Sequence, residues 1–196
     1  EPNNDMYDGW MFTWSRISQK NNNYPILLFT GRTWGGEEPE KIDDYYAIKK
    51  VENLVWIAEN VNAKGKNFAG ENFKVVPTTD NSSDGINVVF DLQHKLWTPI
   101  GFSETNSFQG SFDFGNLTIK NLTTNGYYKN NLYNEANLVK SYVGLFGYTK
   151  NAEFKGNINF VKDENTPLEG AHIRSLESYA GAFIGYAKNT MFDENF

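Results

Sequence analysis

A short phrase occurs twice near the end of the chain, and it limits the possible fold more than any other feature. SYVGLFGYTKN runs from Ser141 to Asn151, and SYAGAFIGYAKN runs from Ser178 to Asn189. Self-similarity at a spacing of about 20–50 residues is typical of proteins that stack repeated units, each burying its apolar face against the next. We therefore expect the two copies to lie one above the other, with Phe146 and Phe183 at equivalent corners.

The region around the repeat has the period of a β-strand. The fragments LTIKNL, AEFKGN and TMFDEN share one pattern, in which a central apolar residue is followed by a charged residue. Their central residues are Ile119, Phe154 and Phe192. Alternation of apolar and polar residues between Gly and Asn turns favours stacked strands over a helical repeat. We predict that Phe154 and Phe192 are buried neighbours on successive strands.

One segment, residues 47–62 (AIKKVENLVWIAENVN), has the apolar period of a helix. Leu54 and Ala58 fall on its apolar half, and we expect them to point into the core. Trp56 falls within the polar half, where a binding role is an alternative to a second packing surface. We favour packing because large aromatic side chains are mostly buried.

Several phrases occur in an order that resembles the bacterial GLUG-repeat proteins. They are IKKVENLVWIAENVN, FAGENFKVV, LWTPIGF, FQGSFDFGNLTIKNL and YVGLFGYTKNAEFK. The resemblance covers roughly residues 44 to 196, and it implies a right-handed parallel β-helix of the pectate-lyase type. The chain departs from the family pattern at Phe112-Asp113-Phe114-Gly115-Asn116, where the family has FDGNG. This departure predicts a rebuilt turn, with Phe114 either inside the protein or exposed.

The fold class that we predict is all-β, a right-handed parallel β-helix (β-solenoid) with an N-terminal capping α-helix over residues 47–62. Residues 44–196 would form this module and continue beyond residue 196. Residues 1–43 would be an N-terminal segment, the end of a preceding module plus a linker. Because strands at an uncovered end can pair with another chain, we expect self-association or an adjacent module at the open end.

Composition excludes some partners. The formal net charge of −6 argues against a nucleic-acid partner, which favours a basic surface. The longest apolar run, PILLF at residues 25–29, is too short to cross a bilayer. The chain has no cysteine, so disulfides, thiolate metal sites and cysteine nucleophiles are absent.

Catalytic patterns are weak, and we predict no catalytic residue, no metal site and no cofactor. Only two histidines, His94 and His172, are present, and neither accompanies a nucleophile motif. Asp113 is the one acid inside a repeated strand phrase, and a turn hydrogen bond explains it better than glycosidase chemistry, which needs two apposed carboxylates. The spacing of Asp80, Asp84 and Asp91 imitates a calcium loop, although no flanking helices are predicted; a solvated loop is the favoured interpretation.

Two polar insertions, residues 123–140 and 161–177, interrupt the repeat. Insertions in stacked-repeat proteins carry function more often than the repeats themselves. We predict that both emerge from one edge and, if binding is the function, form one ligand-binding surface; tolerated surface insertions without a ligand are the favoured alternative. Its candidate residues are Tyr127, Tyr128, Tyr133, His172 and Arg174.

The resemblance implies a non-catalytic bacterial module, extracellular or on the cell surface, that acts as an adhesin or a rigid display scaffold. Its expected partner is a host or cell-surface protein or a glycan. Two alternatives stay open: a carbohydrate-active enzyme similar to polysaccharide lyases, and an accessory module of a surface peptidase.

Overall fold

The computed structural model describes residues 14–16, 25–27, 35–93, 97–125, 142–161, 172–174 and 179–193. The chain divides into two compact units, Glu1–Thr33 and Trp34–Phe196. In the first unit, strand β1 (Trp14–Arg16) pairs antiparallel with β2 (Pro25–Leu27). The candidate sites below lie in the second unit.

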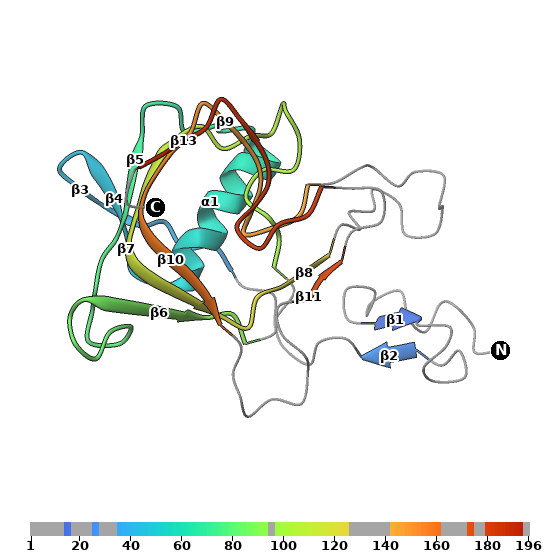
Figure 1. Cartoon of the computed structure of the whole chain (residues 1–196), viewed down its shortest axis with the longest axis horizontal. Helices are drawn as coiled ribbons and strands as arrows, with labels where there is room; N and C mark the ends of the chain where they lie inside the picture. The colour runs from blue at the N-terminus through green and yellow to red at the C-terminus, as the bar shows by residue number, and fades with distance from the viewer. Residues whose placement is uncertain are drawn as a thin grey trace. The chain divides into compact units, whose positions relative to one another are not determined.

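The second unit is built mostly of strands with one helix, α1 (Val51–Lys64) (Figure 1). Its main sheet contains β3 (Glu40–Ile42), β4 (Tyr45–Ile48), β5 (Asn72–Val75), β6 (Asn87–Asp91), β7 (Ser111–Lys120), β10 (Glu153–Val161) and β13 (Met191–Phe192). Two further sheets are parallel pairs: β8 (Thr123–Asn125) with β11 (His172–Arg174), and β9 (Phe146–Lys150) with β12 (Ile184–Lys188).

The predicted fold class is wrong for the structure as described. The main sheet has seven strands and is mixed, because β3 pairs antiparallel with β4 while the other pairs in it are parallel. β3 and β4 are separated by Asp43 and Asp44, a turn too short for the crossover that a parallel pair requires. The result is a mixed sheet with a helix against its core, and not the all-parallel β-helix expected from the repeat.

An aromatic column runs across the parallel part of this sheet. β4, β5, β7, β10 and β13 pair so that one aromatic residue of each strand faces the next. This central aromatic column consists of Tyr46, Phe73, Phe112, Phe154 and Phe192. Ring centroids lie 5.2 Å apart for Tyr46 and Phe73, and 5.8 Å for Phe73 and Phe112, with nearly parallel planes. Like residues therefore stack at the strand spacing, as the sequence repeat predicted in general terms.

The predicted register was only half correct. Phe154 does pair with Phe192, but its partner in β7 is Phe112. Ile119 pairs instead with Phe160. Strand β7 is 10 residues long and contains two apolar stretches of the same period, one around Phe112 and one around Ile119. Alternation alone cannot decide which of them lies opposite Phe154.

A register shift in β7 accounts for the unusual FDFGN phrase. Asp113 pairs with Lys155, whereas Asn116 pairs with Asn157, so β7 accommodates one extra residue. Phe114 lies in this bulge and is fully buried. Of the two positions that the sequence allowed for Phe114, the structure shows the inner one.

Burial decreases at the last strands of the described chain. Phe154 is fully buried, whereas Phe192 is 47% exposed, so the prediction that both are buried is wrong for Phe192. β13 pairs with β10 through only two residues, and no residue of 179–193 is fully buried. The outermost layer, defined here as residues 179–193, thus exposes side chains whose counterparts one strand inward are covered.

Helix α1 begins later than predicted, because residues 45–48 form strand β4. Asn53 fixes its start: Asn53 Oδ1 accepts hydrogen bonds from the backbone N–H groups of Lys49 and Lys50, 2.9 and 3.2 Å away. Gly65, at φ 67°, ends the helix. Leu54 and Ala58 are buried as expected.

Trp56 is also buried, and its ring contacts Tyr46 and Phe68. The expectation of a second packing surface on the helix is confirmed. Asn53 and Asn60, which fall on the polar half of the helical wheel, are buried as well. Their side-chain amides donate to the carbonyl oxygens of Glu37 and Trp56, which satisfies them away from water.

The two copies of the repeated phrase are neighbours, as the sequence predicted. β12 pairs with β9 in parallel, with Tyr186 opposite Tyr148 and Lys188 opposite Lys150. Phe146 pairs with Ile184 rather than Phe183, because the second copy carries one extra residue. The rings of Phe146 and Phe183 still pack 5.8 Å apart.

Candidate functional site

Most of the predicted binding residues lie outside the described residues. These are Tyr127, Tyr128 and Tyr133, and His94 lies outside as well. His172 and Arg174 form the two ends of β11, whose pairing with β8 is described for the backbone. The predicted five-residue surface therefore stays a prediction.

The strands that flank the two insertions pair with each other, but the insertions interrupt them at different points. Val161, the last residue of β10, pairs with Lys120, the last residue of β7, and His172 in β11 pairs with Thr123 in β8. Residues 162–171 therefore separate β10 from β11, whereas only Asn121 and Leu122 separate β7 from β8, and the longer part of the first insertion follows β8. This pairing does not support the expectation that both insertions emerge from one edge.

The acids singled out in the sequence make hydrogen bonds within turns. Asp113 Oδ1 accepts from Gly115 N at 2.9 Å, the turn bond that the sequence favoured. Asp91 Oδ1 accepts from Gln93 N at 2.7 Å and from Asn121 Nδ2 at 2.9 Å. Within residues 35–93, 97–125, 142–161 and 179–193, no three His, Asp or Glu side chains are grouped closely enough to hold a metal ion.

Asp84 organises the loop that imitates a calcium site. Its Oδ1 accepts hydrogen bonds from the N–H groups of Asn87 and Ile86 and from Ser82 Oγ. These bonds, the one from Asn87 N foremost, hold the pKa of Asp84 well below its usual value. The carboxylate is therefore used as an acceptor for its own loop.

We expect the loop to lose stability in acid through Asp84. Because the pKa of Asp84 is lower in the folded than in the unfolded chain, its stabilising contribution is present above the unfolded pKa, about 3.9, and is lost as the pH falls below that value. The wild-type chain should exceed Asp84→Asn in unfolding free energy near neutral pH, and the difference should shrink from about pH 4 downward. Urea unfolding of both chains across this range measures it; a difference that does not change with pH would contradict the assignment.

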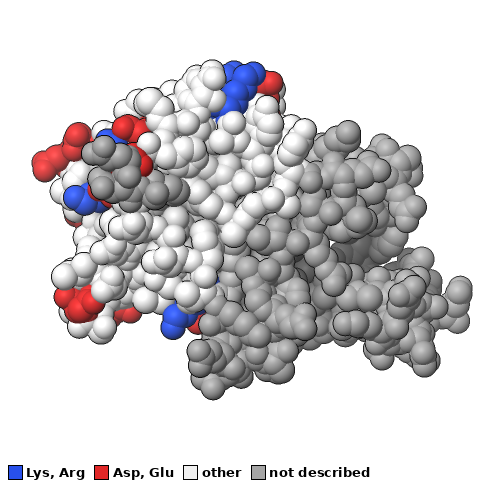
Figure 2. Space-filling view, viewed as in Figure 1, with Lys and Arg blue, Asp and Glu red and all other residues white. Residues whose placement is uncertain are grey.

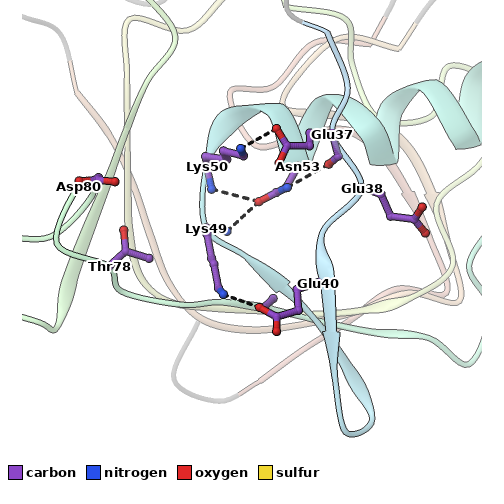
Figure 3. A pocket seen from close by; sticks show the side chains of 9 residues that line it. Glu37, Glu38, Glu40, Lys49, Lys50, Asn53, Thr78 and Asp80 are labelled. Atoms are coloured by element: carbon purple, nitrogen blue, oxygen red, sulfur yellow. Dashed lines mark hydrogen bonds and ion pairs between the residues drawn. The ribbon is translucent and has the colours of Figure 1, made fainter.

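A pocket of about 570 Å³ lies between residues 37–40, the start of α1 and residues 78–80 (Figure 3). Its charged lining consists of Glu37, Glu38, Glu40, Lys49, Lys50 and Asp80. Lys50 Nζ lies 2.6 Å from a carboxylate oxygen of Glu37, and Lys49 Nζ lies 2.7 Å from one of Glu40. Figure 3 shows both lysines turned toward these acids.

The charged groups of this pocket fasten the residue 37–40 segment to the helix. Asn53 adds a hydrogen bond to Glu37 O at 3.0 Å. The ion pairs are largely exposed, and pairs of this kind contribute at most about 1 kcal/mol each. The arrangement accounts for the local structure without a ligand.

A cluster of four tyrosines lies where the two copies of the repeated phrase meet. This tyrosine cluster consists of Tyr142, Tyr148, Tyr179 and Tyr186. Tyr142 and Tyr179 are stacked, with ring centroids 5.6 Å apart and planes 11° apart. Tyr148 and Tyr186 face each other across β9 and β12 at 4.9 Å. The rings thus form two adjoining columns, one strand spacing high.

Exposure rises steeply from the inner to the outer layer of the tyrosine cluster. Tyr148 is only 3% exposed, and burial raises the pKa of its phenol. Tyr179 is 61% exposed, although its ring is held by contacts with Tyr142 and Tyr186. The cluster therefore presents one rigidly supported aromatic ring to solvent.

Two lysines and one glutamate lie next to these columns. Lys150 follows Tyr148, and Lys188 follows Tyr186, by two residues, so each lysine shares a strand face with its tyrosine. Glu104 accepts from Lys188 Nζ at 2.7 Å and from Lys150 Nζ at 3.4 Å. This contact lowers the pKa of Glu104 and raises that of Lys188. Two cations share one anion, so the group carries one surplus positive charge.

The tyrosine cluster was not predicted as a site. Its signal was nevertheless present, because the SY and GY pairs of tyrosines recur at equivalent positions in both copies of the phrase. Identical aromatic residues at equivalent positions form columns when the copies stack. These tyrosines lie beside, and not inside, the phenylalanine core.

Two rings of the cluster, Tyr179 and Tyr186, belong to the outermost layer. Figure 2 shows the described residues of the face that carries β10 and β13: its centre is free of Lys, Arg, Asp and Glu, and charges gather at its rim. Large apolar side chains are exposed in this layer at Tyr179, Met191 and Phe192. Exposed apolar surface of this kind commonly marks interaction sites.

In the part of the chain that the structure describes, no helix is long and apolar enough to span a membrane. Comparison with known proteins gives no relative: no family model, no curated protein and no solved structure matches this chain.

Proposed function

We propose that the chain is a non-catalytic module of a bacterial cell-surface or secreted protein, acting as an adhesin or a rigid display scaffold. The observation that carries the proposal is the in-register stacking of aromatic residues from five strands, which ends in an exposed outermost layer. A tightly packed core of this kind holds the surface residues attached to it in fixed positions. Fixed side chains lose little entropy when a partner binds, so they favour binding over catalysis that needs movement.

The use of its polar residues supports a structural role for the strands. Asp84, Asp91 and Asp113 each accept backbone hydrogen bonds from residues two or three positions later. Glu37 and Glu40 form ion pairs with Lys50 and Lys49, which directly precede α1, and these pairs hold the 37–40 segment in place. Carboxylates used in this way are poorly placed to act on a substrate.

Location is proposed from the sequence. The phrases that resemble GLUG-repeat proteins imply an extracellular or surface position, and the absence of cysteine is compatible with bacterial export without disulfides. The exposed aromatic side chains of the outermost layer supply a surface on which a protein or glycan can bind.

The test compares retention with cleavage. The full chain is incubated with immobilised polygalacturonate, alginate and a denatured protein, and the supernatants are assayed for unsaturated uronides, new reducing ends and new peptide ends. We expect retention on one of these surfaces without any products, while an added lyase or protease serves as the positive control. Product formation proportional to the concentration of the chain would contradict the proposal and favour an enzyme.

A further inference from the structure

We propose that the tyrosine cluster, together with Lys188, is a glycan-binding site for a sugar that carries a carboxylate. In this site a pyranose ring stacks on the exposed ring of Tyr179, and the sugar carboxylate meets the ammonium group of Lys188. The inference rests on the adhesin role proposed above, and it names the ligand class and the residues of that role.

The first argument is the preorganisation of Tyr179. Its ring is 61% exposed, yet it stacks on Tyr142 at 5.6 Å and contacts the edge of Tyr186 at 5.5 Å. A ring that is fixed before binding loses little side-chain entropy when a ligand arrives. Stacking needs one free face, and Tyr142 covers only the other.

The second argument is the chemistry of an aromatic face. The π-face of a ring is electron-rich, so it attracts the weakly positive C–H hydrogens on the flat face of a pyranose. A tyrosine also carries a hydroxyl group, which donates to and accepts from sugar hydroxyls. The cluster offers several such hydroxyl-bearing rings around one stacking position.

The third argument is charge. Lys150 and Lys188 share the single carboxylate of Glu104, which leaves one positive charge without an anionic partner within the group. Lys188 lies two residues beyond Tyr186 on the same strand face, and Tyr186 contacts Tyr179. Tyr186 therefore links the two groups, because its ring contacts Tyr179 and it lies on the strand face of Lys188.

The charges elsewhere in the chain bear on the binding of an acidic sugar at this site. The chain as a whole has a net charge of −6, so the local surplus of Lys150 and Lys188 over Glu104 is opposite in sign to the charge of the whole chain. Figure 2 shows no charged residue at the centre of the face in view, among those described. Within the described residues of this layer Asp193 is the one carboxylate, and Glu104 beside Lys188 is already paired with two lysines.

The experiment is calorimetric titration of the full chain with trigalacturonate and, in parallel, with a neutral galactose trisaccharide. We expect trigalacturonate to bind more tightly than the neutral sugar, with an affinity that falls as salt rises. Tyr179→Ala should weaken binding about tenfold or more, and Lys188→Met should weaken it several-fold and remove most of the salt dependence. Tyr179 is exposed and Lys188 is half-buried, so neither change cuts into the core; circular dichroism checks that each variant is folded.

Matched controls are available in β4 and β5. Lys74 Nζ lies 5.9 Å from the ring centroid of Tyr45, so this pair has the same composition at another part of the surface. Tyr45→Ala and Lys74→Met should leave trigalacturonate binding unchanged within about twofold.

The proposal is overturned if the wild-type chain binds no trigalacturonate at millimolar concentration, or if Tyr179→Ala binds it as tightly as wild type. It is also overturned if light scattering shows that wild type self-associates and Tyr179→Ala does not, because the ring would then be a protein contact. None of these results contradicts the non-catalytic function, which fails only if the chain releases products.

Discussion

Replacing Phe154 by alanine is expected to lower the free energy of unfolding by about 3–5 kcal/mol. Phe154 is fully buried, and its ring centroid lies 5.0 Å from that of Phe146 and 5.1 Å from that of Phe183. It also stacks on Phe114 and Phe108, at 5.8 and 6.2 Å. Truncation leaves a cavity between layers that paired strands cannot close.

The matched control is Phe192→Ala, which removes the same atoms from the next position of the central aromatic column. Phe192 pairs in register with Phe154 but is 47% exposed, so we expect a loss of only about 1–2 kcal/mol. Urea unfolding, with midpoint and slope measured separately, gives both values. Equal losses for the two variants would contradict the order of burial along the column.

Gly101→Ala is expected to destabilise the chain by about 3 kcal/mol, from left-handed backbone strain and overpacking together. Gly101 has a φ of +78°, a conformation that alanine adopts poorly. A Cβ there would also collide with the carbonyl oxygen of Tyr148 and come within 3.0 Å of Asn106 O. Both atoms belong to hydrogen-bonded backbone, because Phe108 N donates to Tyr148 O and Phe102 N donates to Asn106 O.

Gly70→Ala separates the two causes. Gly70 has the same φ of +78°, but a Cβ there meets nothing within 4 Å. It should therefore show the strain alone, about 1 kcal/mol. If thermal or urea unfolding gives the same loss at both glycines, the close approach of residues 101 and 148 plays no part in stability.

The sequence predicted those parts of the fold that depend on local periodicity. The 3.6-residue period located α1, and the buried positions of Leu54, Ala58 and Trp56 followed from the apolar half of the wheel and the size of Trp. The repeated phrase predicted that β9 and β12 lie together, which they do. In each case the sequence pattern lies in the same segment as the structural element that it predicted.

Features that depend on competition between distant segments were not predicted. Ile119 and Phe112 both precede a charged residue in a strand of period two, so this pattern alone does not decide which one faces Phe154; in the structure it is Phe112. The antiparallel pairing of β3 with β4 depends on a two-residue turn after a short, mostly exposed strand, whose apolar signal is weak. The fold class failed at this point, because the repeat carries no information about the strands that precede it.

The predicted binding residues Tyr127, Tyr128 and Tyr133 lie outside the described residues, so that site stays a prediction. The tyrosine cluster comes from the repeated phrase and not from the insertions, and the sequence analysis did not single it out. Whether a repeated aromatic residue faces inward or outward depends on the corner geometry of the strands. The extra residue between Ala180 and Ile184 alters that geometry in the second copy.

Disulfide trapping tests the central claim, the in-register stacking of the strands, most directly. The chain has no native cysteine, so two introduced cysteines can react only with each other. Thr118 and Asn159 are paired across β7 and β10, and their Cα atoms should lie within the roughly 7 Å that a disulfide permits. Lys120 and Lys155 would be neighbours in the register that the sequence suggested, but here Lys155 pairs with Asp113, roughly 20 Å from Lys120 along the strand. Under mild oxidation, Thr118→Cys with Asn159→Cys should cross-link, and Lys120→Cys with Lys155→Cys should not. Cross-linking of the second pair but not the first would contradict the stacking described here.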